Sequence, residues 1–265
     1  MPAETCDWYD TPLYYDIIFD DDTATEATFL EVMHLRHGRG TSSKSRTLLE
    51  PACGSGRLMV EMARRGWIAS GFDANEAMLE HARERLKSIH LTGKLWQDRM
   101  ERFQLTGRKK FDLAHCLVST FKYLQTESDA LNCLQRVADA LKPGGIFVLG
   151  LHLSDYTKQA ITHERWVASR DGIHVVCNTR TWPANRAKRT EAMRNRLRIT
   201  FPDGRIRNQE TLWEFRTYSA AQLRALLKKV PQLNLVACHD FHCDPDSTRK
   251  LDDSYADIVL ILKRT

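Results

Sequence analysis

No run of apolar residues in this sequence is long enough to cross a membrane as a helix. The first residues also lack the basic, apolar and small-residue order of a secretory signal peptide. The seven cysteines are scattered and are never spaced as C-x-x-C, which argues against a disulfide framework and a zinc ribbon. We therefore expect a cytoplasmic protein that does not associate with membranes and holds no metal.

Internal repeats and low-complexity tracts are also missing, so the 265 residues fit one large α/β domain or a domain with an insertion. The formal net charge of +5 is unevenly spread. From Arg180 to Arg198 there are seven basic side chains and one acid, an excess of six, which leaves five minus six, or −1, for the rest of the chain. A broad cationic face for nucleic acid is therefore not expected.

Apolar and basic residues alternate from Arg194 to Phe201, a pattern typical of a strand with one buried and one solvated face. The turn Pro202-Asp203-Gly204 follows and would place Glu210 roughly opposite Arg196 on the next strand. A solvated, cross-strand charged face is sufficient to explain the basic residues. The alternative is a surface for an anionic substrate or RNA.

Strand and helix patterns alternate between residues 41 and 151, which predicts a parallel sheet covered by helices on both faces. The expected strands of this part are Thr47–Leu49, Ala69–Phe72, Leu95–Gln97, Phe111–Val118 and Ile146–Leu151. A later helix, Ser219–Lys229, and two last strands, Leu233–Phe241 and Ala256–Leu262, complete the doubly wound, mainly parallel, seven-stranded sheet that we expect.

Three parts of the chain are expected to have different tasks. Residues 39–151 and 219–265 form the main α/β domain. Residues 152–218, which have strand-like patterns, form an antiparallel β lid inserted after the fifth strand. Residues 1–38 precede the first strand and should pack over it, covering the site.

The stretch "TLLEPACGSGRL" places a carboxylate and a loop of small residues between the first strand and the next helix. Ligands bind there in doubly wound sheets, and Gly54 and Gly56 allow the backbone to approach a ligand closely. A phosphate-loop motif is missing, and Met59 stands where a dinucleotide fingerprint needs a glycine. Glu50 suits a positively charged cofactor, and Asp73, at the end of the second strand, can accept hydrogen bonds from ribose hydroxyls.

At these residues the sequence resembles the class I S-adenosylmethionine-dependent methyltransferases, which have a Rossmann-like fold. "LLEPACGSGRL" and "GFDANEAML" are similar to their first two motifs. "FDLAHCLVSTFKYL" and "ALKPGGIFVLGL" are similar to their fourth-strand and fifth-strand segments. "WYDTPLYYDIIF" resembles the aromatic N-terminal segment of small-molecule members, such as amino-sugar and glycine N-methyltransferases. The resemblance covers roughly residues 7–151 and the last two strands.

The resemblance implies S-adenosylmethionine as the cofactor and assigns residues to it. The glycines would lie against its methionine part, Glu50 would reach its amino group through water, and Asp73 would bind its ribose. Ala74 would lie beside the adenine. The full implied cofactor-binding set is Tyr9, Tyr14, Glu50, Ala52, Gly54, Gly56, Asp73, Ala74, Asp98, Met100 and Leu117.

Two parts of this assignment leave alternatives. In "QDRMERF", Arg99 stands where the family usually has an acid, and Asp98 lies one residue earlier. Tyr9, with Tyr14 or Tyr15, would cover the site, although core packing of these rings is an equal alternative. The backbone of Leu117 would flank the methionine part of the cofactor.

Methyl transfer from a sulfonium is a direct in-line displacement, so the protein mainly has to orient the acceptor and exclude water. If a base is needed, His152 at the end of the fifth strand is the first candidate, although a structural histidine is the simpler interpretation. Second candidates are Ser119, Tyr123, Asp155 and Tyr156. An amine acceptor that arrives neutral needs no base.

The implied function is methyl transfer to a nitrogen or oxygen of a small molecule. A non-catalytic S-adenosylmethionine-binding protein of the same fold is one alternative. An RNA methyltransferase is another, but the chain lacks an Asn-Pro-Pro-Tyr motif after the fourth strand. "CHDFHCD" does not bring four metal ligands together, so a structural metal is not expected. The sequence leaves the oligomeric state open, with a homodimer as one option.

Overall fold

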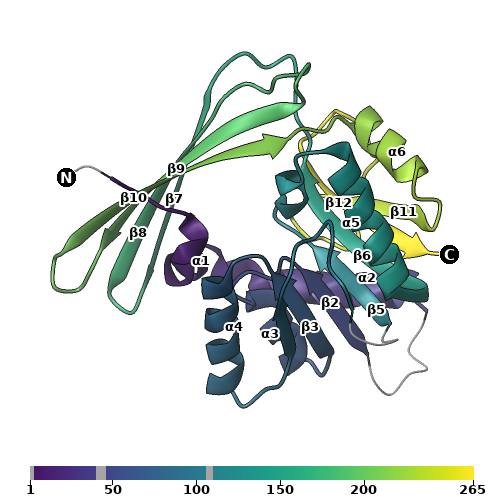
Figure 1. Cartoon of the computed structure of the whole chain (residues 1–265), viewed down its shortest axis with the longest axis horizontal. Coiled ribbons are helices and arrows are strands. Elements are labelled where there is room, and N and C mark those ends of the chain that lie inside the picture. The colour runs from purple at the N-terminus through teal and green to yellow at the C-terminus, as the bar shows by residue number, and fades with distance from the viewer. Residues whose placement is uncertain (1–2, 40–45, 106–109) are drawn as a thin grey trace.

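The computed structural model describes residues 3–39, 46–105 and 110–265. Within these residues, the chain forms two sheets with helices around them (Figure 1). The larger sheet has the strand order β11-β12-β6-β5-β2-β3-β4. Its strands are β2 (Thr47–Pro51), β3 (Ile68–Asp73), β4 (Lys94–Gln97), β5 (Phe111–Cys116), β6 (Leu141–His152), β11 (Leu233–His239) and β12 (Asp257–Arg264).

Strands β6, β5, β2, β3 and β4 pair in parallel, and β12 runs antiparallel between β6 and β11. The helices are α2 (Thr23–His37), α3 (Arg57–Arg64), α4 (Glu76–Ser88), α5 (Glu127–Ala140) and α6 (Ala220–Lys228). Helices α2, α3 and α4 contribute to the apolar core on one face of the sheet, and α5 and α6 to the core on the other. The predicted mainly parallel, Rossmann-like α/β fold is therefore confirmed.

Local sequence signals fix where several helices begin. The side chain of Asn75 accepts a hydrogen bond from the Met78 amide at the start of α4, and Thr126 does the same for the Asp129 amide before α5. Ser219 and Gln222 form a reciprocal capping box at α6. Such caps supply partners for amides that the first helical turn leaves unpaired.

The smaller sheet has the order β1-β10-β9-β8-β7. It consists of β1 (Glu4–Thr5), β7 (Thr162–Arg170), β8 (Ile173–Thr181), β9 (Thr190–Thr200) and β10 (Ile206–Arg216). Glu210 lies directly opposite Arg196, which donates a hydrogen bond to it, and Arg194 lies 3.7 Å from the same carboxylate. The expected pairing across the Pro202-Asp203-Gly204 turn is therefore present, and Leu197 and Ile199 are buried on the opposite face.

The N-terminal segment, which we expect to pack over the first strand, also contributes to the smaller sheet. Strand β1 pairs in parallel with β10 of the smaller sheet. The short helix η1 (Trp8–Asp10) and helix α1 (Pro12–Phe19) pack their aromatic and aliphatic side chains against the inner face of that sheet. Only α2, which follows η2 (Asp20–Asp22), packs on the larger sheet. Figure 1 shows α1 between the two sheets.

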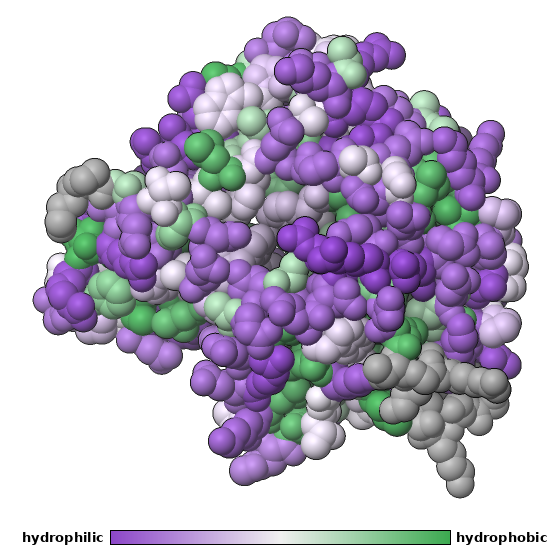
Figure 2. Space-filling view, in the orientation of Figure 1, coloured by the Kyte–Doolittle hydropathy of each residue, from purple (hydrophilic) through white to green (hydrophobic). Residues whose placement is uncertain are grey.

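No helix in residues 3–39, 46–105 and 110–265 has both the length and the apolar character that a membrane crossing requires. The face shown in Figure 2 is mainly hydrophilic, with apolar residues in small separate groups. All seven cysteines are free thiols, and six of them are buried.

Candidate active site

A cavity of about 470 Å³ lies at the carboxyl ends of the parallel strands. Residues that follow β2, β3, β4 and β5 line one side of it, and residues of η1, α1 and β10 line the other. The cavity therefore opens between the larger sheet and the part of the molecule built from the N-terminal segment and the smaller sheet. In open α/β sheets, this edge is the usual place for a ligand.

The loop after β2 has an unusual backbone. Ala52, Gly54 and Gly56 all have positive φ angles, of 54°, 52° and 71°. A Cβ built on Gly54 would meet no atom of the described residues within 4 Å, because this position faces the open cavity. A Cβ on Gly56 would instead lie 2.8 Å from the Cβ of Ala82 in α4. Gly56, which the resemblance assigns to the methionine part of the cofactor, is not among the residues that line the cavity, and it is the point where α3 and α4 approach closely.

Asp73 is held rigidly at the end of β3. Its two carboxylate oxygens accept hydrogen bonds of 2.8 Å from the amides of Gly54 and Asn75. Burial raises the pKa of Asp73 above its usual value, while these amides act in the opposite direction. Asp73 and its neighbour Ala74 line the cavity as predicted. The carboxylate is thus preorganised, with lone pairs left for ligand hydroxyl groups.

Glu50, at the end of β2, is 9% exposed and faces the same cavity. Its Oε2 has no hydrogen-bond partner among the described residues, and burial raises its pKa to about 8. His115 on β5 lies close by: its Nε2 is 3.8 Å from Glu50 Oε2, and burial lowers its pKa to about 3. A buried carboxyl oxygen without a partner fits a cationic ligand group such as an amine.

The loop after β4 supplies the next wall. Asp98 accepts hydrogen bonds from the amides of Arg99 (2.8 Å) and Gln104 (3.0 Å), so its carboxylate shapes this loop. Asp98 and Met100 line the cavity, as does Leu117 after β5. Sequence reasoning placed these residues at the site but gave no role to the side chain of Arg99, which also lines it.

Four aromatic rings together form a wall of the cavity: Tyr9, Tyr15 and Trp213 from the side opposite the sheet, and Tyr123 from the segment after β5. The hydroxyl groups of Tyr9 and Tyr123 are hydrogen-bonded at 2.8 Å. Burial raises the pKa of Tyr15 to about 12 and those of Tyr9 and Tyr123 well above their usual value. All three phenols are therefore neutral at physiological pH. Trp213 comes from β10 and had no local sequence signal, because only the pairing of the smaller sheet places it here.

Tyr14 does not line the cavity, so this prediction needs correction. Its ring is buried in the core of the smaller sheet, with its centroid 6.5 Å from that of Phe201. Tyr14 and Tyr15 are consecutive residues of α1, and successive side chains of a helix point about 100° apart. Tyr15 therefore takes the position at the cavity.

His152 also differs from its prediction as a base. Its side chain is 47% exposed, with Nδ1 2.6 Å from Asp257 Oδ1, and it does not line the cavity. The reason is that the end of β6 pairs with β12, so the imidazole lies beside Asp257. Of the second candidates, Tyr123 lines the cavity, whereas Ser119, Asp155 and Tyr156 do not.

The segment "CHDFHCD" comprises the last two residues of β11 and the hydrogen-bonded loop that follows, and none of its residues lines the cavity. Asp240 accepts hydrogen bonds of 2.8 and 2.6 Å from Arg249, and Nδ1 of His239 lies 2.8 Å from the carbonyl oxygen of Ser247. In the part of the chain that the structure describes, no three His, Cys, Asp or Glu side chains are grouped so that they could hold a metal ion.

Residues 48–145 match the family model described as a methyltransferase domain. These residues include Glu50, Asp73, the loop Ala52–Gly56 (the glycine loop) and the loops after β4 and β5. Together they form the sheet side of the cavity. The match to the family model thus falls on the same part of the chain as the motifs that resemble methyltransferases.

Two curated relatives have similar sequences. A putative methyltransferase of a Geobacillus species is 28% identical over 144 residues, which are 54% of this chain and 56% of the relative. The dTDP-3-amino-3,4,6-trideoxy-alpha-D-glucopyranose N,N-dimethyltransferase of Streptomyces venezuelae is 32% identical over 138 residues, 51% of this chain and 54% of the relative. The chain thus spans about half the length of the curated relatives it matches.

Solved structures are similar over almost the whole chain. An S-adenosylmethionine-dependent methyltransferase from Clostridium acetobutylicum has a TM-score of 0.74 and 19% identity, covering 95% of this chain and 96% of the other. DesVI of Streptomyces venezuelae has a TM-score of 0.72 and 22% identity, covering 94% of both chains. At these identities the likeness shows a shared fold, including the part outside residues 48–145.

Proposed function

We propose that this protein is an S-adenosylmethionine-dependent methyltransferase that acts on a nitrogen or oxygen of a small molecule by direct in-line transfer. The observation that carries the proposal is the pair Glu50 and Asp73, which flank Gly54 at the ends of neighbouring strands. The unpartnered Glu50 oxygen fits the amino group of the methionine part, and Asp73 fits the ribose hydroxyls. The exposed backbone at Gly54 fits the part of the cofactor that joins its amino group to its ribose.

When bound, the cofactor supplies a methyl group that its sulfonium has already activated. The chain then has to exclude water and orient the acceptor. The wall of Tyr9, Tyr15, Tyr123 and Trp213 excludes water, and its paired hydroxyl groups can orient a polar atom of the acceptor. The raised pKa values keep these phenols protonated at neutral pH, so they cannot accept a proton as a base. An amine acceptor that arrives neutral would need no base from them.

An amine is the acceptor that the wall and the charges favour. Aromatic faces attract ammonium groups. Five acids line the cavity among the described residues, against the two arginines Arg57 and Arg99. Arg57 is already engaged by Thr23 at 3.0 Å and by Glu26. The Streptomyces venezuelae relative is named as an N,N-dimethyltransferase of an amino sugar, which agrees with a nitrogen acceptor here.

The proposal also assigns a separate role to each of three parts of the chain. Residues 39–151 and 219–265 bind the cofactor, and residues 152–218 form a lid that selects the acceptor, since β10 brings Trp213 to the cavity. Residues 1–38 cover the cofactor through Tyr9 and Tyr15.

The test measures binding by calorimetry and turnover with a labelled methyl donor. We expect binding of S-adenosylmethionine and S-adenosylhomocysteine and none of NAD. Asp73→Ala should weaken binding about ten- to a hundredfold, since a hydrogen bond to a charged group contributes roughly 1.5–3 kcal/mol. Asp203→Ala, in an exposed turn, is the matched control and should change nothing. Absence of binding by the wild type would refute the proposal.

Assays of methyl transfer distinguish the proposed function from its two alternatives, an RNA methyltransferase and a non-catalytic binding protein. Amino sugars and simple amines, the matching hydroxyl compounds and total RNA are offered as acceptors. Label on amines supports methyl transfer to a nitrogen of a small molecule, and label on RNA supports an RNA methyltransferase. Cofactor binding without label on any acceptor favours the non-catalytic alternative.

A further inference from the structure

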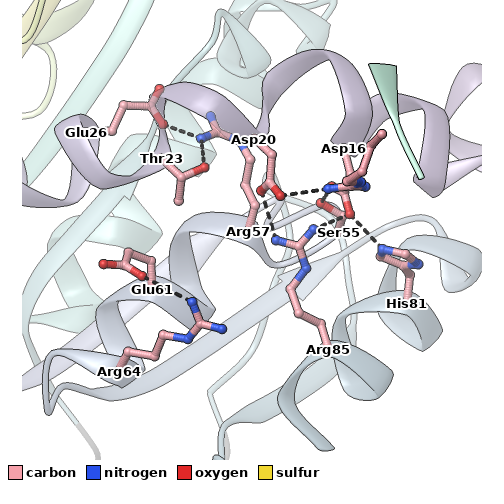
Figure 3. Close-up of polar contacts among 11 residues, drawn as sticks. Asp16, Asp20, Thr23, Glu26, Ser55, Arg57, Glu61, Arg64, His81 and Arg85 are labelled. Carbon is pink, nitrogen blue, oxygen red and sulfur yellow. Dashed lines mark hydrogen bonds and ion pairs between the residues drawn. The ribbon is translucent and has the colours of Figure 1, made fainter. Parts of the chain in front are cut away.

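Asp16, in the middle of α1, is fully buried although it is charged. Figure 3 shows its carboxylate at the centre of a cluster of polar side chains from three parts of the chain. It accepts hydrogen bonds from Ser55 Oγ and from the guanidinium of Arg85, and His81 Nε2 lies 2.7 Å from it. Ser55 belongs to the glycine loop, whereas His81 and Arg85 belong to α4.

The glycine loop requires support from outside. Three of its five residues, from Ala52 to Gly56, have positive φ angles, and one of them, Ala52, is not a glycine. A non-glycine residue keeps such a backbone only where surrounding contacts determine it. From the sheet side, the Cys53 amide donates to the Phe72 carbonyl oxygen at 2.9 Å, and the Gly54 amide donates to Asp73. From the opposite side, the support is the hydrogen bond between Ser55 and Asp16.

Asp16 also fixes the helix that covers the cavity. Its neighbour Tyr15 lines the cavity, whereas Asp16 itself does not. Arg85 also binds Asp20 at 3.1 Å, and Asp20 binds Arg170 of β7 at 2.8 Å. Burial alone would raise the pKa of Asp16, but the hydrogen bond with His81 and the charge of Arg85 hold it below its usual value. Asp16 is therefore ionised at neutral pH.

We propose that Asp16 is a positioning residue, which holds Ser55 so that residues 52–56 keep the conformation that binds the cofactor. Through the same contacts it holds Tyr15 over the cavity. One carboxylate therefore fixes both the glycine loop and the ring that covers the cavity. The link to cofactor affinity rests on the proposed function. The link between Asp16 and the conformation of the loop does not.

The first experiment uses the unliganded protein, so that it is independent of the proposed function. Hydrogen exchange of the Gly54 and Gly56 amides is compared in the wild type, Asp16→Asn, Ser55→Ala and Asp20→Asn. Asp20→Asn is the matched control, because it weakens the contacts to Arg85 and Arg170 and leaves Ser55 alone. We expect about tenfold faster exchange in the first two variants and less than about twofold change in the control.

The second experiment measures the affinity for S-adenosylhomocysteine by calorimetry. Asp16→Asn and Ser55→Ala should each weaken this affinity about tenfold. The double variant should bind no more weakly than the single variant with the lower affinity, because both changes act through the contact between Asp16 and Ser55. Ser55→Thr, which keeps the hydroxyl group, should retain most of the affinity. A purely structural role of Asp16 would instead give independent, additive losses.

The outcomes are distinct. Unchanged exchange in Asp16→Asn, equal effects of Asp16→Asn and Asp20→Asn, or additive losses of affinity would overturn the proposal. If Asp16→Asn does not fold, the comparison of Ser55→Ala with Ser55→Thr decides in the same way. If the wild type binds no cofactor, the proposed function fails, and the exchange experiment alone still decides the role of Asp16 in the loop.

Discussion

Glu50 Oε2 lies 3.8 Å from His115 Nε2 across the neighbouring strands β2 and β5, and neither atom has a hydrogen-bond partner among the described residues. The other imidazole nitrogen of His115 also lacks one. Burial raises the pKa of Glu50 to about 8 and lowers that of His115 to about 3. Both groups are therefore mainly neutral at pH 7, and the cavity of the free protein carries one charge fewer than its sequence suggests.

This pair predicts how cofactor affinity depends on pH. An ammonium group beside Glu50 favours the ionised carboxylate, so binding below the pKa of about 8 must release the proton of Glu50. Affinity for S-adenosylhomocysteine should then rise with pH, by up to about tenfold per unit, and level off above the pKa. Calorimetry in two buffers with different ionisation enthalpies measures the released proton. Glu50→Gln should remove the pH dependence, and a wild type that releases no proton would contradict the idea.

The hydroxyl pair of Tyr9 and Tyr123 should act on the acceptor and not on the cofactor. Tyr123→Phe keeps the ring and removes one hydroxyl group, so kcat/KM for the acceptor should fall about tenfold, with cofactor affinity within about threefold. The matched control is Tyr156→Phe, whose hydroxyl group bonds Thr217 and Gln222 at 2.8 and 2.9 Å outside the cavity. Equal losses in both variants would show that the hydroxyl pair has no special role.

His152→Gln should leave turnover almost unchanged, because the imidazole is exposed, bound to Asp257 and outside the cavity lining. We expect kcat within about twofold of the wild type in steady-state assays. A general base would contribute about a hundredfold or more. A loss of that size would restore His152 as a base and would require a rearrangement of the end of β6.

The two glycines of the loop should fail in different ways. In Gly56→Ala the new Cβ meets Ala82 at 2.8 Å, so the free energy of unfolding should fall by about 1–3 kcal/mol. In Gly54→Ala the new Cβ points into the cavity, so cofactor affinity should fall more than stability does. Urea unfolding and calorimetry on both variants test this, and the reverse pattern would contradict the placement of the loop.

The arginines of β9 should not make this protein a nucleic-acid enzyme, because Glu210 pairs with two of them. Replacing Arg194, Arg196 and Arg198 together by Gln should leave cofactor affinity within about twofold. A surface that tracks phosphates loses roughly a thousandfold or more in affinity between about 50 and 200 mM salt. A salt titration with fluorescent RNA should show weak binding and a shallow slope. Tight binding with a steep slope would contradict this.

The sequence was sufficient for features that are local or periodic. The strand–helix alternation predicted the mainly parallel sheet, and the motifs placed Glu50, Gly54 and Asp73 around one cavity. Alternation across the turn predicted that Glu210 faces Arg196. Each of these follows from the direction of side chains along one element or from the shared carboxyl edge of parallel strands.

The rest depended on which segments pair across long distances in the chain. Tyr14 and Tyr15 could not be told apart until the smaller sheet was seen to bury the first of them. His115 faces Glu50 because β5 pairs with β2, and Trp213 lies at the cavity on β10, which pairs with β9 and β1 in the smaller sheet. Such contacts carry no short-range signal.

The stacking of Trp8 on Trp213, with ring centroids 5.8 Å apart, has a consequence for biosynthesis. A ribosome makes Trp8 early and Trp213 only after β7, β8 and β9 have emerged. The larger part of the parallel sheet, β2 to β6, is complete before that point. The strands of the cofactor side and three of the four aromatic rings are therefore synthesised before Trp213, and until β10 arrives the indole of Trp8 lacks this stacking partner.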